Sequence, residues 1–227
     1  MAFHPVYVSC FEVGKYVARF DRRSVMLPAW IDVIFVDPGN PFYYSEGNCL
    51  IDRRTGDVVL GCRNSEIPSD GSVTGIADFA FMDCTGLKRL DFPDSVERIG
   101  AYAFFGCSGL TEVTLPPRLR KVEPFAFARC EGLTSVTLPD GIESICERAF
   151  GYNAELHNVH FNGSVPEELD DSAFRGCRKT LFSCSREDPQ NTARMNKLLG
   201  QLRLSAIITG LLRKLEESGR EPPETEE

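Results

Sequence analysis

The chain has 227 residues, a formal net charge of −8 and a hydrophobic fraction of 42%. This is the composition of an ordinary soluble protein, and the length suffices for a continuous core. Acidic character without a cluster of Lys and Arg disfavours a nucleic-acid partner, because phosphate binding needs concentrated positive charge. No run approaches the roughly 18–20 apolar residues that span a bilayer, so we expect no membrane insertion.

Residues 1–29 form an N-terminal region with two alternating stretches, VYVSCFEV and YVARF. Alternation predicts short strands, which we interpret as a cap on one end of the fold. The region lacks the uninterrupted apolar segment of a secretory signal. A complete chain is therefore expected in the cytoplasm, whereas a fragment of a longer gene product would be a cell-surface or secreted protein.

The next region contains a predicted hairpin at about residues 48–62. Its arms are Leu50-Ile51 and residues 58–60, and the sequence RTGD at 54–57 forms the turn between them. Ile67-Pro68 indicates a further strand end before the regular part of the chain. That regular part extends over about residues 73–184.

The regular part repeats every 23 residues, as AFMDCTGL at 80, AFFGCSGL at 103 and AFARCEGL at 126 show. A weaker copy begins at Ala149, with Asn153 in the place of Cys, and a fifth begins at Ala173. Periods of 20–50 residues are typical of solenoids and propellers. A propeller blade needs four strands in about 40–45 residues, whereas each copy here has one strand, so the period predicts a solenoid.

Each copy contains one predicted strand. Val113 and Leu115 alternate and share one strand face. Pro116 ends the strand because it lacks a backbone N–H. Stacking of copies pairs these strands in parallel and builds one long core.

The rest of each copy predicts a short helical turn on the opposite side. Ile99, Ala103 and Cys107 are spaced i, i+4 and i+8, which places them on one helical face. Gly109 stands where a helix end requires left-handed dihedral angles, as do Gly86 and Gly132.

The complete pattern, I-x-x-x-A-F-x-x-C-x-x-L-x-x-V-x-L-P, resembles the BspA-like class of leucine-rich repeats. The segment Asn-Pro-Phe-Tyr at 40–43 is similar to a turn that leads into a small hairpin in such proteins. The resemblance covers roughly residues 30–184. It implies a leucine-rich-repeat solenoid, with a parallel β-sheet and short helical turns on the opposite face. It also implies a role like that of bacterial surface and adhesion-type repeat proteins, which bind other proteins.

Residues 185–217 are predicted to form an α-helix, because Met195, Leu198, Leu199 and Leu202 recur at three- and four-residue steps. We interpret it as a cap over the last coil, with a partner-binding element as the alternative. The tail, residues 218–227, is rich in Pro and Glu and is predicted to be disordered.

Residues with reactive side chains fit structural roles better than catalytic or metal-binding ones, and no cofactor is expected. The recurring cysteines and phenylalanines are in phase with the core positions, so we interpret both as packing residues. His157 and His160 are three apart on a strand and face opposite ways, unlike the ligands of a helical zinc site. The acidic residues Glu167, Glu168, Asp170 and Asp171 are interpreted as a solvated loop, with an enzymatic site as a remote alternative.

The outward positions of the strands vary from copy to copy and are the candidate partner-binding residues. They are Arg89, Asp91, Glu112, Thr114, Ser135, Thr137, Asn158 and His160. We predict a non-enzymatic module that binds a protein or peptide partner through this face, because solenoids present extended surfaces. The alternatives are a cytoplasmic adaptor or scaffold of the same fold and a solvated surface without a ligand. The oligomeric state is left open.

Overall fold

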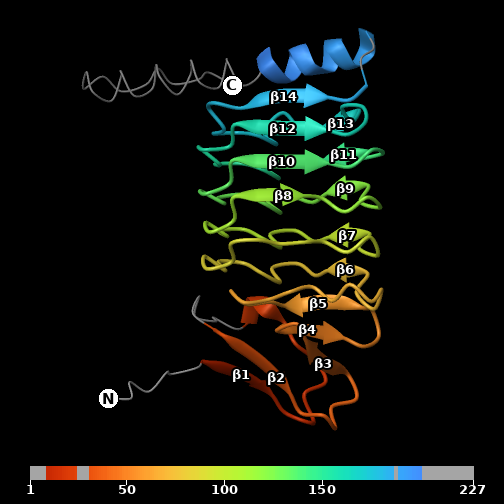
Figure 1. Cartoon of the computed structure of the whole chain (residues 1–227), viewed down its shortest axis with the longest axis vertical. Helices are drawn as coiled ribbons and strands as arrows, with labels where there is room; N and C mark the ends of the chain where they lie inside the picture. Colours follow the sequence, from red (N-terminus) through yellow and green to blue (C-terminus); the bar gives the residue numbers. More distant parts are fainter. Residues whose placement is uncertain (1–8, 25–30, 187–188, 201–227) are drawn as a thin grey trace, which may run out of the picture.

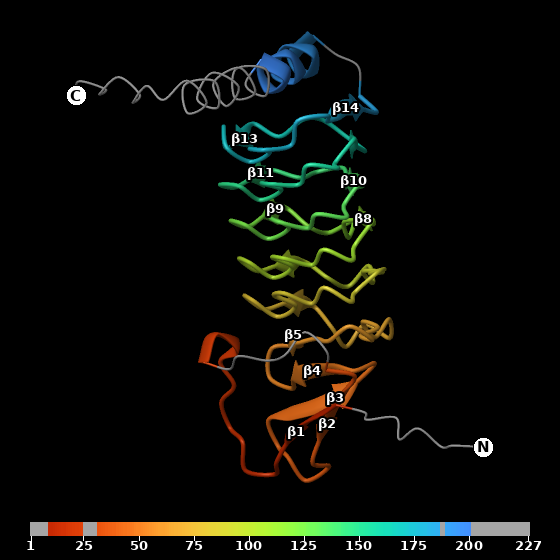
Figure 2. The same ribbon diagram turned by 90° about the vertical axis from the view of Figure 1, so that its left-hand side faces the viewer.

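The computed structural model describes residues 9–24, 31–186 and 189–200. These residues form an elongated stack of coils that follow one another along the long axis in sequence order (Figure 1). The coils from β8 (Glu112–Thr114) to β13 (Glu168–Leu169) contribute short strands to two faces, as the side view in Figure 2 shows. The predicted solenoid is confirmed.

One face carries a four-stranded parallel sheet, which we call the strand face. Its members are β8 (Glu112–Thr114), β10 (Ser135–Leu138), β12 (Asn158–Phe161) and β14 (Leu181–Cys184). Val136 pairs with Val113 on one side and with Val159 on the other. The register of the sheet therefore equals the sequence repeat, and equivalent side chains lie directly above one another.

The opposite face consists of strands of two residues each. They are β6 (Gly75–Ile76), β7 (Arg98–Ile99), β9 (Lys121–Val122), β11 (Ser144–Ile145) and β13 (Glu168–Leu169). The first two pair with each other, and the last three form a separate sheet.

The segment predicted as a helical turn follows each of these strands and is a succession of tight turns instead. After β7, the Ala103 N–H donates to the Gly100 carbonyl, three residues earlier, at 3.3 Å. Tyr102 and Gly106 have φ values of 57° and 74°, which lie outside the helical range. A residue with left-handed dihedral angles recurs at every fourth position, so the core side chains keep their four-residue spacing. Their inward direction therefore agrees with the prediction, but the backbone conformation does not.

The predicted reason for the recurring glycine was also wrong. Gly109 is absent from the residues with positive φ. A Cβ atom at Gly109 would lie 2.4 Å from the Thr85 carbonyl oxygen and 2.8 Å from that of Leu87. A Cβ atom at Gly132 would lie 2.4 Å from the Ser108 carbonyl oxygen. These glycines recur because adjacent coils approach too closely for a side chain.

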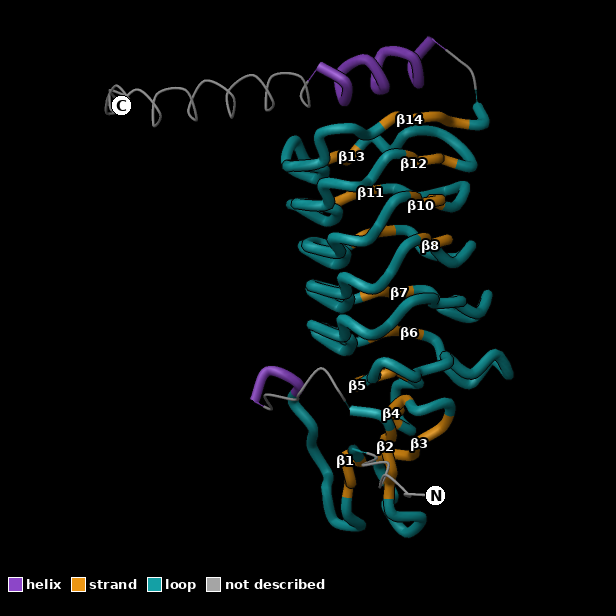
Figure 3. The backbone as a smooth tube through the Cα atoms, turned by 60° about the vertical axis from the view of Figure 1, so that its left-hand side comes forward, coloured by secondary structure: helices purple, strands orange, loops and turns teal. Residues whose placement is uncertain are grey.

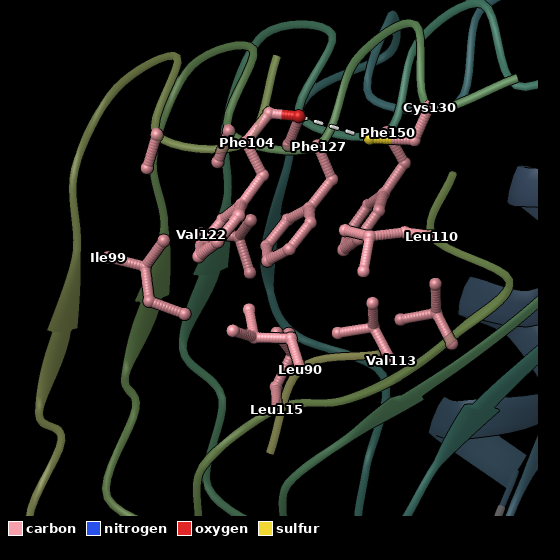
Figure 4. Packing of buried hydrophobic residues seen from close by; sticks show 14 of the residues in the cluster. Leu90, Ile99, Phe104, Leu110, Val113, Leu115, Val122, Phe127, Cys130 and Phe150 are labelled. Atoms are coloured by element: carbon pink, nitrogen blue, oxygen red, sulfur yellow. Dashed lines mark hydrogen bonds between the residues drawn. The ribbon is translucent and has the colours of Figure 1, made fainter. Parts of the chain in front are cut away.

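A ladder of stacked phenylalanine rings runs through the centre of the core (Figure 4). Its members are Phe81, Phe104, Phe127, Phe150 and Phe174, none more than 2% exposed. Successive ring centroids lie 4.9, 5.0, 5.6 and 5.2 Å apart with nearly parallel planes. Stacked aromatic pairs contribute about 0.5–1.5 kcal/mol beyond their buried area, so the ladder joins consecutive coils.

The cysteine of each copy hydrogen-bonds to the coil before it. The Cys130 thiol donates to the Phe104 carbonyl at 3.1 Å, the contact dashed in Figure 4. Cys107 and Cys177 make the same contact to Phe81 and Phe150. In the fourth copy the Asn153 amide takes over and donates to the Phe127 carbonyl at 2.9 Å. The position therefore selects a small buried donor, which explains why Asn can replace Cys.

The N-terminal part closes the other end of the stack. β1 (Cys10–Val13) pairs in parallel with β2 (Val33–Val36), and a 3-10 turn spans Arg22–Ser24. β3 (Tyr43–Glu46), β4 (Cys49–Asp52) and β5 (Asp57–Leu60) form an antiparallel meander, and β5 then pairs with β6. The predicted hairpin arms are β4 and β5, while β3 was not predicted. Of the predicted N-terminal strands, residues 10–13 form one, residues 16–20 form none, and residues 6–8 lie outside the described part.

Asn40, the first residue of the Asn-Pro-Phe-Tyr segment, organises this end. Its side chain is 2% exposed, and its amide donates to the Gly14 and Val17 carbonyls at 2.9 and 3.1 Å. Its Oδ1 accepts the backbone N–H groups of Phe42 and Tyr43. One buried side chain thus fixes the turn before β3 and joins it to the loop after β1.

Residues 189–200 are helical and lie across the C-terminal end of the stack (Figure 3). Leu198 is 3% exposed and belongs to the main core. The Asn191 Oδ1 accepts the Val165 N–H at 3.1 Å, and Arg194 donates to the Val165 carbonyl at 2.9 Å. This part of the predicted helix therefore covers the last coil, whereas residues 201–227 lie outside the described part.

Candidate interaction surface

The outward side chains of the strand face form two in-register rows. The first row is Glu112, Ser135, Asn158 and Leu181, and the second is Thr114, Thr137, His160 and Ser183. Their neighbours Val113, Val136 and Val159 are buried in the core. Strand alternation thus places the constant residues inside and the variable residues outside, and six of the eight predicted site residues lie in these rows.

The rows differ in chemical character along the stack. Glu112, Thr114 and Asn158 are exposed, and Ser135, Thr137 and His160 are partly buried. Both ring nitrogens of His160 are engaged, Nδ1 with the Ser183 hydroxyl at 2.8 Å and Nε2 with the Ser185 hydroxyl at 3.1 Å. These two hydrogen bonds hold the His160 ring against the next coil. The side chains at the centre of the surface are therefore small or polar and can form hydrogen bonds.

Leu181 and Ser183 were missed by the sequence analysis. Leu181 is 68% exposed and is the large apolar side chain of the first row. Both residues follow Asn158 and His160 by one repeat, so extending the same 23-residue period would have found them.

Arg89 and Asp91, the two remaining predicted residues, are not part of the sheet. They lie one coil below β8 in residues 88–92, which form no strand (Figure 1). Their exposed side chains pair with each other, with Arg89 Nε 3.0 Å from Asp91 Oδ2. Arg89 and Asp91 precede Glu112 and Thr114 by one repeat, but they do not belong to the sheet that carries the two rows.

The other candidate groups have structural partners. Glu167 pairs with Arg194, and Asp171 lies 3.7 Å from Lys197, so the acidic loop contacts the helical residues that cover the last coil. Burial raises the pKa of the Cys84, Cys130 and Cys177 thiols to about 12, which suppresses the reactive thiolate. All nine cysteines are free.

In residues 9–24, 31–186 and 189–200, His, Cys, Asp and Glu side chains nowhere gather in threes with the geometry to hold a metal ion. Within the same segments, every helix is too short or too polar to cross a bilayer.

Residues 61–183 match the family described as BspA type Leucine rich repeat region, in six copies. The match covers more than half of the chain. This chain belongs to the BspA-type leucine-rich repeat family. The six copies are one more than the five recognised in the sequence.

Solved structures of bacterial proteins share the fold of this BspA-type chain. A leucine rich cell surface protein from Faecalibacterium prausnitzii A2-165 aligns with a TM-score of 0.71 at 22% identity, over 82% of this chain and 50% of that chain. The pneumococcal vaccine antigen PcpA aligns with a TM-score of 0.63 at 19% identity, over 83% and 53% respectively. The chain thus spans about half the length of these proteins. No curated protein sequence matches it significantly.

Proposed function

We propose that this BspA-type repeat protein is a non-enzymatic module that binds another protein through the strand face. The observation that supports the proposal is the difference between the buried and the outward positions of each repeat. Buried positions are nearly constant from coil to coil, whereas the two outward rows change from Glu112 to Leu181 and from Thr114 to Ser183. Stability does not require that variation, and a stacked sheet holds such side chains in fixed positions for recognition.

We place the protein among surface or adhesion-type repeat proteins if it is part of a longer exported product. A cytoplasmic adaptor or scaffold with the same binding face is the second candidate. The likeness to the cell surface protein from F. prausnitzii favours the first, by analogy of fold. Fractionation of the producing cells, followed by immunodetection, separates the two locations.

The binding face is tested by partner capture and mass spectrometry with matched variants. The face variant carries Glu112→Lys, Ser135→Lys and Asn158→Lys. The control carries Glu147→Lys and Glu168→Lys, which alter the net charge by the same amount at exposed positions away from the strand face. The proposal expects the partner to be recovered by the wild type and the control but not by the face variant. Equal recovery by all three proteins would remove the strand face as the binding site.

A further inference from the structure

One position of the turn segments has left-handed backbone dihedral angles in five successive coils. Its occupants, which we call the turn row, have φ values of 59°, 74°, 56°, 63° and 87°, and they are Asp83, Gly106, Arg129, Tyr152 and Gly176. Glycine adopts such angles freely, whereas a Cβ atom makes them unfavourable. The backbone alone therefore favours glycine, which two coils have. Arg129 and Tyr152 are kept against this preference, and strained residues of this kind cluster at functional sites.

The Arg129 side chain is exposed and lies between aromatic rings of the two neighbouring coils. Its Cζ atom is 5.9 Å from the centroid of the Phe105 ring in the coil before it and 5.9 Å from that of the Tyr152 ring in the coil after it. At such distances a guanidinium group is attracted to the face of an aromatic ring. The two rings thus hold the guanidinium group at the surface, while its N–H donors lie in its own plane and point outward from its edge.

Arg129 differs from the other arginines that lie over aromatic rings. Within the described residues there are four of these, and each has an acceptor for its N–H groups: Arg23 with Asp21, Arg53 with the Tyr43 carbonyl, Arg54 with Asp52, and Arg148 with Glu147. Across the same part of the chain, no carboxylate or other acceptor lies within bonding distance of the Arg129 guanidinium group. Arg129 is therefore held in place but not paired.

A carboxylate is the acceptor that fits this group. A planar guanidinium group pairs with a carboxylate through two parallel N–H···O bonds. Phosphate is bound where several cations gather, but the guanidinium group of Arg148 in the next coil already pairs with Glu147. The surface beside Arg129 is aromatic, because Tyr152 is 40% exposed and Phe105 is only partly buried. Tyrosine and arginine are enriched among the residues that dominate the binding energy of protein interfaces.

We propose that Arg129 binds the carboxylate of an Asp or Glu side chain in a segment of a partner protein, with Phe105 and Tyr152 holding the guanidinium group in place. An apolar side chain next to that carboxylate packs on the exposed part of the Tyr152 ring. The site lies on the turn segments and not on the strand face, so it is a second interaction surface. The inference goes beyond the proposed function and does not depend on it.

The left-handed position allows these side chains to be removed without disturbing the turn. Arg129→Gly and Tyr152→Gly each introduce the residue that already occupies the same position in two other coils. Arg118→Gly is the matched control, the same chemical change at an exposed arginine that pairs with Glu97. The thermal midpoint of Arg129→Gly is expected to lie within about 3 °C of wild type. A fall of more than about 6 °C would show that folding requires Arg129 and would overturn the proposal.

The probe is a displayed random-peptide library selected on the wild-type protein and depleted of peptides that also bind Arg129→Gly. Survivors are expected to carry Asp or Glu beside an apolar residue. Each is synthesised twice, once with the carboxylate and once with the corresponding amide. On the wild type the amide peptide is expected to bind about five- to tenfold more weakly, because a charge-assisted pair is lost. On Arg129→Gly the two peptides are expected to bind within about twofold of each other, because the partner of the carboxylate is absent.

The ring of Tyr152 and the strand face are tested with the same peptides. Tyr152→Gly is expected to weaken binding of the carboxylate peptide about threefold or more, because the guanidinium group loses one of the rings that hold it. Arg118→Gly, and a strand-face variant with Ser135→Lys and Asn158→Lys, are expected to bind it within about twofold of wild type. Loss of peptide binding in the strand-face variant alone would move the site to that face and remove only this inference.

The proposal is overturned if no acidic peptide survives the depletion, or if the amide lowers the affinity equally on the wild type and on Arg129→Gly. Displacement of the peptide by inorganic phosphate but not by acetate at equal ionic strength would assign the site to phosphate instead. Concentration-dependent self-association of the wild type that Arg129→Gly abolishes would assign it to a second copy of the chain.

Discussion

Replacing Phe104 by alanine is expected to destabilise the protein more than almost any other single substitution. Phe104 is fully buried, and its ring stacks on Phe81 at 4.9 Å and on Phe127 at 5.0 Å. It also meets the ring of Phe92 edge-on at 5.6 Å. Deletion of a buried Phe side chain costs about 3–5 kcal/mol, and three aromatic neighbours place Phe104→Ala in the upper half of that range.

The matched control is Phe105→Ala, the same chemical change one residue later. Phe105 is only partly buried, and its ring contacts Tyr102 at 5.6 Å and the Arg129 guanidinium at 5.9 Å. Its loss is expected to cost about 1–2 kcal/mol.

Urea unfolding followed by circular dichroism gives both free energies. Thermal unfolding should show a midpoint about 8–20 °C below wild type for Phe104→Ala, at about 2–4 °C per kcal/mol for a chain of this length. A Phe104→Ala midpoint within a degree or two of wild type, or equal to that of Phe105→Ala, would refute the ladder as the centre of the core.

Three further predictions concern the core and the C-terminal cover. Asn153→Cys should raise the free energy of unfolding by up to about 1 kcal/mol, because the buried Asn153 Oδ1 has no hydrogen-bond partner and Cys restores the donor of the other copies. A lower free energy of unfolding in urea would contradict this. Stability should fall as pH rises from about 9 toward 12, by up to about 1.4 kcal/mol per pH unit for each buried thiol. The sign follows because burial raises the pKa of Cys84, Cys130 and Cys177 to about 12, so the folded state binds protons that the unfolded state releases. A free energy of unfolding that is flat from pH 8.5 to 10.5 would argue against it. Asn191→Ala should cost about 1–3 kcal/mol and speed hydrogen exchange of the Val165 amide, its bonding partner, whereas the exposed Asn196→Ala on the same helix should do neither.

The register of the repeat could be predicted from the sequence because burial imposes it. Ala103, Phe104 and Cys107 recur at fixed spacing, and each occupies the same buried site in its coil. The same period located the outward rows of β10 and β12, since strand alternation determines which side chains face solvent.

Backbone conformation between the strands could not be predicted from spacing. A helix and a succession of four-residue turns both place side chains at i, i+4 and i+8, so the positions of Ile99, Ala103 and Cys107 did not distinguish them. The positive φ of Tyr102 and Phe125 was hidden because bulky residues rarely adopt it. The recurrence of Gly109 was attributed to its dihedral angles, whereas its cause is the close approach of the neighbouring coil. That approach is a contact between residues far apart in sequence, so the local pattern did not reveal it.

Strand pairing at residues 88–92 also depends on neighbours rather than on local pattern. Leu90 and Phe92 alternate in the same way as Val113 and Leu115, yet only the second pair belongs to a sheet. Because β-propensity depends on the adjacent strand, the position of Arg89 and Asp91 outside the sheet was not visible in their own copy.

Site-specific photocrosslinking in the producing cell tests the central claim, that the strand face binds a protein. A benzophenone amino acid is placed at Thr137, in the middle of the second row, and, in a separate protein, at the exposed position Glu147 away from that face. A partner bound to the strand face should give a discrete crosslinked adduct from Thr137 and none from Glu147. Adducts from Glu147 alone, or none from Thr137 at saturating illumination, would contradict it.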